Sequence, residues 1–233
     1  MLKNLDRFFR ERGIRLALIV LVMYLISIAQ GTITYSAFVG QLSSRVSSGH
    51  HLFAIAQNLF RIGVLLLMIT LWALNRKRAL FRLIIVANSF FTVMLLLQTG
   101  YLVQLLSGTS ASAVSTMMGD AALLAVSNIL VFSIWYWIID PPDVIEDAPE
   151  RPWAFLFPQR GSALPHYEGW VPRYGDYVFV AFTTSVAFSP TDALPLTRTA
   201  KLLMLLQATI SIITLVGIVG GGINIFVGGS SSP

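Results

Sequence analysis

The sequence predicts an all-α fold: a polytopic membrane helical bundle with four N-terminal spans, a half-helix that is re-entrant or short and tilted, and a long glycine-rich final span. Of the 233 residues, 55% are hydrophobic and only 12% are charged. The apolar residues form five long runs, at 14–39, 53–74, 80–106, 121–139 and 202–227. Each run is near or above the length of about 20 residues that crosses a bilayer as a helix.

Changes in composition divide the chain into four parts. A four-span bundle with a basic N-terminus comes first, and aromatic residues at the end of its fourth span are expected to lie at the membrane interface. An acidic surface segment follows, in which the prolines argue against a helix. The half-helix, the final span and a tail expected to be disordered complete the chain. The four parts are residues 1–139, 140–175, 176–227 and 228–233. The aromatic residues at the end of the fourth span are Trp135, Tyr136 and Trp137.

Basic residues indicate the orientation of the chain. They gather before the first run and in the short connection at 75–79, whereas the 107–120 loop has none. Short basic loops stay in the cytoplasm, so the N-terminus is predicted inside a bacterial cytoplasmic (inner) membrane and the 107–120 loop outside. The net charge of +5 follows from this asymmetry, and it indicates the lipid bilayer and not a nucleic acid as partner. The basic residues are Lys3, Arg7, Arg10, Arg12, Arg15, Arg76, Lys77 and Arg78.

The chain offers little for enzyme chemistry. It has no cysteine, which excludes disulfides, thiol nucleophiles and thiolate metal sites. Its three histidines, His50, His51 and His166, have no metal-ligand spacing, and no glycine-rich phosphate loop or Gly-x-Ser-x-Gly motif is present. We therefore expect no enzymatic activity, no cofactor and no metal site.

Polar residues inside the apolar runs are better candidates, because each is unfavourable in lipid and usually faces protein or water. Arg61 lies well inside the second run. It either reaches outward to the interface or provides a fixed positive charge near a conduction path. Other polar residues are expected to form hydrogen bonds between helices. They are Gln30, Thr34, Asn88, Gln98, Asn128, Gln207, Thr214 and Asn224.

The last run carries a cluster of glycines, with Gly217 and Gly221 at the spacing that lets helix backbones approach closely. Gly220 extends the cluster. Close helix packing is the first interpretation. A bend that gates a channel is the alternative, because glycines also make a long helix easier to bend.

The stretch at 176–201 is too short and too broken to cross a bilayer. Residues 176–188 are mostly apolar, and as a helix they rise about 20 Å, which reaches the middle of a hydrocarbon core about 30 Å thick. Pro190 and Pro195 then end the helix. Broken backbone at that depth is tolerated only where protein buries it or where it lines a water-filled cavity. The stretch is therefore a candidate pore or binding loop.

At these residues the chain resembles the pore loop and inner helix of potassium-channel-like proteins. Their filter reads Thr-Val-Gly-Tyr-Gly and is followed by an Asp and a Pro. The whole stretch AFTTSVAFSPTDALPLTRTAKLLM also resembles a family of uncharacterised bacterial multi-pass membrane proteins. In the register of the filter stand Ser185, Val186, Ala187, Phe188 and Ser189, preceded by Thr183 and Thr184 and followed by the supporting residues Pro190, Asp192, Pro195 and Arg198.

This resemblance implies a homo-oligomeric pore, with a tetramer favoured, whose ligands are monovalent ions. Ala187 and Ser189 stand where the filter has glycines, so we expect poor selectivity, with hydroxyl groups lining the path. A non-conducting structural or interaction membrane protein is the alternative, and a small transporter is the third possibility. The stretch either re-enters from the cytoplasmic side or crosses as a short tilted span.

Overall fold

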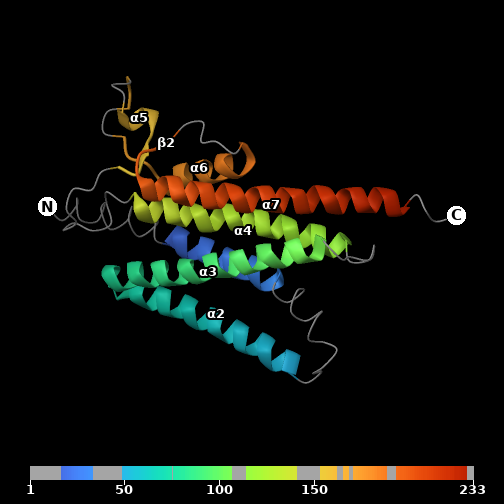
Figure 1. Cartoon of the computed structure of the whole chain (residues 1–233). Helices are drawn as coiled ribbons and strands as arrows, with labels where there is room; N and C mark the ends of the chain where they lie inside the picture. Colours follow the sequence, from blue (N-terminus) through green and yellow to red (C-terminus); the bar gives the residue numbers. More distant parts are fainter. Residues whose placement is uncertain are drawn as a thin grey trace. The chain divides into compact units, whose positions relative to one another are not determined.

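The structure, a computed structural model, describes residues 17–33, 49–74, 76–106, 114–140, 153–161, 165–167, 170–187 and 193–229. Within these ranges the chain is mostly helical (Figure 1). It divides into two compact units, residues 1–92 and 93–233, and each is described by itself. The all-α expectation is confirmed for the described residues, with one short two-stranded ladder added.

In the described part of the chain, three helices are long and apolar enough to cross a membrane: Ala79–Val103, Met118–Ile139 and Arg198–Gly217. They belong to α3 (Lys77–Leu106), α4 (Val114–Ile139) and α7 (Arg198–Gly229). Each helix starts before its apolar run, because helical hydrogen bonding continues through polar residues. The helix α7 also includes Gly228 and Gly229, which we expected in the disordered tail, and residues 230–233 lie outside the described part.

The first unit contains the helix Ala17–Ile33, α2 (Gly49–Ala73) and the first part of α3. The Gln30 side chain donates a hydrogen bond of 2.9 Å from Nε2 to the Phe91 carbonyl, which confirms one expected link between helices. Within the described residues, the apolar helices that match the first two runs are Ala17–Ile33 and Ile62–Ala73. Arg61 lies in α2, but its side chain is outside the described part.

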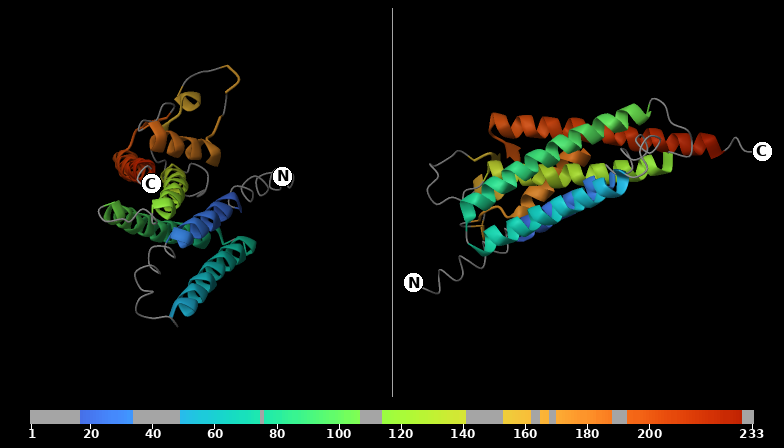
Figure 2. Two further views of the ribbon diagram at one scale, coloured as in Figure 1. Left: turned by 90° about the vertical axis from the view of Figure 1, so that its right-hand side faces the viewer. Right: turned by 90° about the horizontal axis from the view of Figure 1, so that it is seen from below.

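The second unit is built around α4 and α7, which run side by side in opposite directions (Figures 1 and 2). The short helix α6 (Tyr174–Ala187) packs against both. Its buried side chains recur at helical spacing, so they form one stripe toward α4 and α7. The opposite face carries exposed apolar side chains. The stripe consists of Tyr177, Val180, Ala181 and Thr184, and the exposed face of Phe179, Phe182 and Val186.

A small cap closes the end of this unit where α4 ends and α7 begins. In it β1 (Phe155–Leu156) pairs antiparallel with β2 (Leu194–Pro195), and Phe155 lies opposite Pro195. The cap also contains α5 (Pro158–Gly161). Our expectation that prolines keep the 140–175 segment free of helix is wrong at this turn, because a proline is well tolerated in the first turn of a helix.

The aromatic residues at the end of α4 do not all behave as interfacial residues. Tyr136 and Trp137 are buried inside the chain. The Tyr136 ring makes an edge contact with Phe155 of the cap, with a centroid distance of 5.1 Å. Tyr136 therefore packs against the cap, and both side chains are buried within the chain, which differs from the exposed position expected of interfacial residues.

Gly217 of α7 lies where another helix approaches closely. A Cβ added to Gly217 would stand 2.9 Å from Leu102 Cδ2 of α3, within the second unit. A larger residue would therefore require Leu102 to move, which agrees with the packing interpretation at this position. The helix α7 also contains Gly220 and Gly221, whose surroundings lie outside the described part.

Candidate functional site

The segment around α6 runs along α4 and α7 within the second unit and then returns to the end of the unit at which it started. Tyr177, in the first turns of α6, contacts Asp140 directly after α4. Ser185, near the other end of α6, contacts Gln207, which lies about 14 Å along α7 from Arg198 at 1.5 Å per residue. The chain then comes back to β2, which pairs with β1 just before α7 starts. The segment therefore starts and finishes at the same end of this unit.

The length and start of α6 follow from its sequence. Its 14 residues rise about 21 Å, too short for a hydrocarbon core of about 30 Å. At its start the Arg173 amide donates a hydrogen bond of 2.6 Å to Asp176 Oδ2. A carboxylate in the first turn satisfies a free amide and complements the helix dipole. The helix begins at Tyr174, two residues before the expected start.

Gln207 is the centre of a buried polar cluster at the C-terminal end of α6, which we call its deep end because it lies farthest from the cap; the N-terminal end beside the cap is the shallow end. Its Nε2 donates hydrogen bonds of 2.7 Å to the Ala181 carbonyl and to Ser185 Oγ. Its Oε1 accepts a hydrogen bond from the Tyr136 hydroxyl of α4. A single fully buried side chain therefore joins all three helices.

Asn128 of α4 extends this cluster along α7. Its Nδ2 donates to Ser211 Oγ at 2.8 Å and to the Gln207 carbonyl at 3.2 Å. Its Oδ1 is buried and accepts no hydrogen bond among the described residues. The expected interhelical hydrogen bonds are thus confirmed for Asn128 and Gln207. Thr214, in contrast, donates only to Ile210 of its own helix.

A buried ion pair holds the shallow end of α6. Arg160 Nη1 lies 3.0 Å from Asp140 Oδ2, and the two side chains are 5% and 2% exposed. The Tyr177 hydroxyl donates to the same Oδ2 at 2.7 Å, and the Ala154 amide donates to Oδ1 at 2.9 Å. Asp140 therefore connects α4, the cap and α6. Its two oxygens accept hydrogen bonds from a guanidinium, a hydroxyl and a backbone amide, the partners that a buried carboxylate requires.

Aromatic rings keep water away from this ion pair. Phe157 of the cap packs edge-on against Tyr177 with a centroid distance of 5.8 Å, and the Arg160 guanidinium lies 4.9 Å from the centre of the Trp153 ring. The Tyr177 hydroxyl donates its hydrogen bond to Asp140 beneath these rings.

The residues predicted to line a pore lie partly in the last turns of α6. Thr183 and Thr184 donate their hydroxyl hydrogen bonds to carbonyls of the preceding turn, and Ser185 accepts from Gln207. Val186 and Ala187 are exposed. From Thr183 to Ala187 the backbone is helical, whereas a potassium-type filter would be extended. Four further predicted residues lie outside the described part of the chain: Phe188, Ser189, Pro190 and Asp192.

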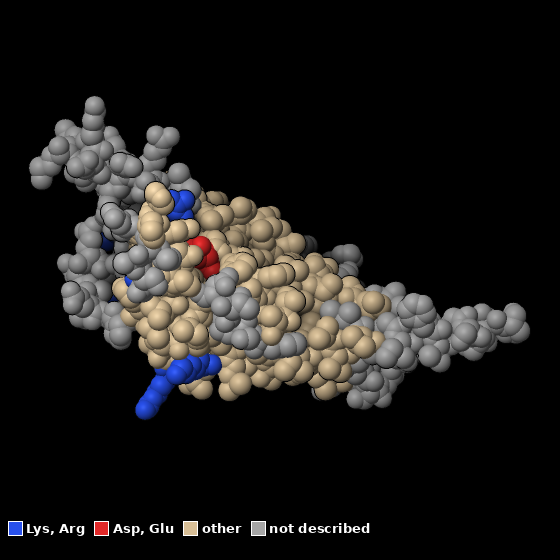
Figure 3. Space-filling model, turned by 90° about the horizontal axis from the view of Figure 1, so that it is seen from above, with Lys and Arg blue, Asp and Glu red and all other residues tan. Residues whose placement is uncertain are grey.

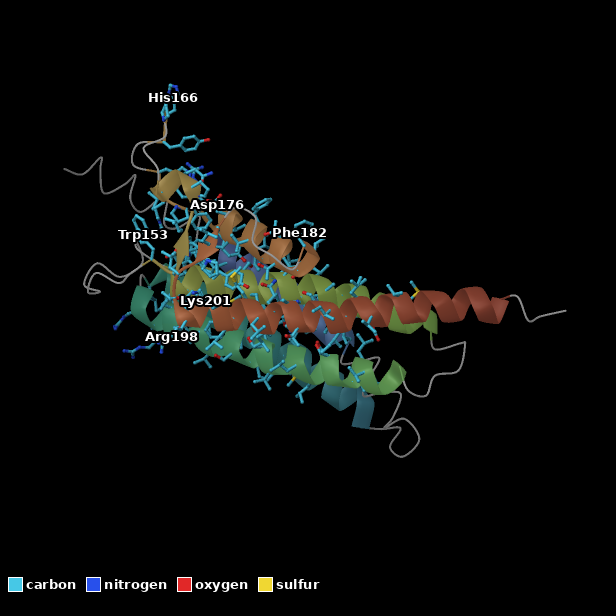
Figure 4. All side chains as sticks on the ribbon, turned by 45° about the horizontal axis from the view of Figure 1, so that its top comes forward. Trp153, His166, Asp176, Phe182, Arg198 and Lys201 are labelled. Atoms are coloured by element: carbon cyan, nitrogen blue, oxygen red, sulfur yellow. The ribbon has the colours of Figure 1, made fainter. Side chains whose placement is uncertain are left out.

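Two supporting residues are placed at the shallow end. Pro195 belongs to β2, and Arg198 opens α7 with an exposed side chain. Figure 4 shows Arg198 and Lys201 at the same end of the second unit as Trp153, with Phe182 farther along. On the face drawn in Figure 3, the described Lys, Arg, Asp and Glu side chains also lie toward one end.

Sequence reasoning missed the ion pair and the position of the polar cluster. Asp140 was grouped with the acidic surface segment, although it directly follows an apolar run, where a carboxylate needs a partner. The spacing between Asp140 and its partner Arg160 is not one that a helix or a strand would bring together, so the sequence does not indicate the pair. Gln207 is one of several polar residues in apolar runs, and its contact with Asn128 depends on the register between α4 and α7, for which the sequence carries no signal.

Comparison of the chain with protein-family models, curated proteins and solved structures gives no match. Among the described residues, no group of three or more His, Asp or Glu side chains is arranged to hold a metal ion.

Proposed function

We propose that the chain is one subunit of a homo-oligomeric, ion-conducting membrane pore for monovalent cations with low selectivity. The observation that carries this proposal is the re-entrant path of α6, which goes to the level of Gln207 and returns to the end where it started. A half-helix that stops inside a membrane is tolerated where protein or water receives its broken backbone. One half-helix cannot surround a path, so several copies related by symmetry are needed, and we favour a tetramer.

The electrostatics of such a half-helix favour cations. The carboxyl end of α6 lies at its deep end, and the helix dipole places partial negative charge there. Repeated around an axis, these ends would attract a hydrated monovalent ion. The exposed face of α6, formed by Phe179, Phe182 and Val186, is the described surface of α6 available for the path or for a neighbouring copy.

The proposed orientation follows from the basic N-terminus. With residues 1–16 in the cytoplasm of a bacterial inner membrane and the 107–113 connection outside, α4 runs inward. The cap, Arg198 and Lys201 then lie on the cytoplasmic side, where basic residues are favoured. The half-helix α6 re-enters from the cytoplasm, and the C-terminus lies outside.

A non-conducting scaffold is the second candidate, and one specific observation favours it. The hydroxyls of Thr183 and Thr184 are bonded inside α6, and Ser185 is bonded to Gln207. A single chain therefore already satisfies the polar groups that would otherwise face a path. In this case the exposed side of α6 would contact lipid or a partner.

The two candidates are separated by ion flux through the purified protein in liposomes. A pore predicts potassium and sodium flux above that of empty liposomes, with little chloride flux. Val186→Asn, on the exposed side of α6, is expected to change the cation flux, because it adds a polar group at the path. The matched control is Val93→Asn on α3, where the valine is exposed to a similar degree, 53% against 60%.

No flux of any of the three ions from a well-folded oligomer, over several voltages and pH values, would contradict the pore and favour the scaffold. Equal effects of the two asparagine variants would show that α6 does not border the path.

A further inference from the structure

The half-helix is held at its two ends by contacts of different kinds. At the shallow end Asp140 and Arg160 form a buried ion pair, and Tyr177 donates to the same carboxylate. Ser133 and Tyr174 add a hydrogen bond of 2.7 Å at this end. At the deep end two hydrogen bonds from the neutral Gln207 amide reach Ala181 and Ser185. Charged, buried contacts therefore fix one end, and neutral contacts fix the other.

This difference makes the deep end the easier one to release. Separating the ion pair would leave a buried charge without its partner, which is strongly unfavourable. Releasing Gln207 breaks neutral hydrogen bonds, which are individually weak between membrane helices, and it also separates the buried Ala181 and Thr184 side chains from α4 and α7, which costs packing but leaves no buried charge. The Ala181 carbonyl also keeps its place in the helix, because Gln207 is an additional partner to the helical backbone bond.

Tyr136 determines which side of the Gln207 amide faces α6. Its hydroxyl donates to Gln207 Oε1, so Nε2 points to the two acceptors on α6, Ala181 O and Ser185 Oγ. A reversed amide would place two oxygens against each other at Ala181. The tyrosine on α4 therefore gives the glutamine on α7 its direction toward α6.

We infer that Gln207 is the positioning residue for the deep end of α6, and that its release lets the half-helix swing about the contact between Asp140 and Tyr177. This inference rests on the proposed function and deepens it. The deep end of α6 (residues 181–187) borders the path, so the contact of the Gln207 side-chain amide with α6 controls the width of the pore. Tyr136 supports the contact between Gln207 and α6 through its hydrogen bond to the Gln207 side chain.

Hydrogen–deuterium exchange on the full chain in lipid nanodiscs tests this inference without relying on conduction. Gln207→Leu is expected to speed exchange of the amides at 181–187 about tenfold, the change expected from losing two interhelical hydrogen bonds. Amides at 174–178 are expected to keep their rate, because the ion pair still holds that end. The matched control is Thr214→Val, a buried polar residue of the same helix that bonds only within α7. It is expected to leave α6 unchanged.

Two milder variants keep the test informative if Gln207→Leu does not fold. Ser185→Ala removes one of the two bonds and is expected to speed exchange at 181–187 about threefold. Tyr136→Phe is expected to act in the same direction, and to add little when Gln207 is already replaced.

Unchanged exchange at 181–187 in all three variants would overturn the inference, and so would a uniform rise over α4, α6 and α7. The outcome is separate from that of the pore itself. A local rise without ion flux would support the hinge and refute the pore, whereas flux without a local rise would refute only the hinge.

Discussion

Replacing Asp140 with asparagine is expected to lower the free energy of unfolding by about 3–5 kcal/mol, because Arg160 would remain buried without a counter-charge. Asparagine keeps the size of the side chain, but its single oxygen cannot accept from both Tyr177 and the Ala154 amide, so the loss reports on the charge and on one hydrogen bond. The measurement is equilibrium unfolding of the purified protein in mixed micelles, followed by circular dichroism.

A matched control and a rescue sharpen this test. Asp176→Asn, also close to the start of α6, removes only a capping carboxylate and should lower stability by about 1 kcal/mol or less. Adding Arg160→Met to Asp140→Asn should restore much of the loss, because removing both charges is often nearly neutral. A double variant that loses the sum of the two single effects would show that the two residues do not act as a pair.

Phe155→Ala is expected to lower the free energy of unfolding by about 3–5 kcal/mol, the range for removing a fully buried aromatic side chain. The Phe155 ring lies 5.1 Å from that of Tyr136 and 6.5 Å from that of Tyr177, measured between centroids. Its loss would leave a cavity between the cap, α4 and α6. Water would then reach the ion pair more easily.

The same unfolding assay measures this effect, and Tyr167→Ala serves as control. Tyr167 lies in the cap segment but is 44% exposed, so its replacement should change stability by about 0.5 kcal/mol or less. Equal losses from the two variants would mean that Phe155 does not fill the space between the cap and the helices.

The helices were predictable because long apolar runs identify them without any knowledge of tertiary contacts. A short helix here was also predictable, since the apolar stretch 176–188, followed by prolines, is too short to cross a bilayer. The pairing of Asp140 with Arg160 was not predictable. It depends on how the chain between them folds back, and neither residue has a spacing that a helix or strand would bring together.

The hydroxyls of the predicted pore stretch show a second limit of sequence reasoning. Threonine in a helix bonds to a carbonyl of the preceding turn as readily as to water, so Thr183 and Thr184 carry no signal for either outcome. The same holds for Ser185, whose partner Gln207 is distant in sequence. Only the register between α6 and α7 decides the partner, and local pattern does not encode that register.

The re-entrant path of α6 can be tested by labelling single cysteines in a chain that has none. Gly175→Cys lies at the start of α6, where an added Cβ meets no atom within 4 Å, and Leu196→Cys lies after β2, where the leucine is 48% exposed. A membrane-impermeant maleimide is applied to right-side-out and to inverted vesicles, with Ser110→Cys as a marker for the outer side. We predict that both cysteines are labelled only from the cytoplasmic side, opposite to the marker. Labelling of the two cysteines from opposite sides would show that the segment crosses the membrane, and it would contradict the re-entrant pore.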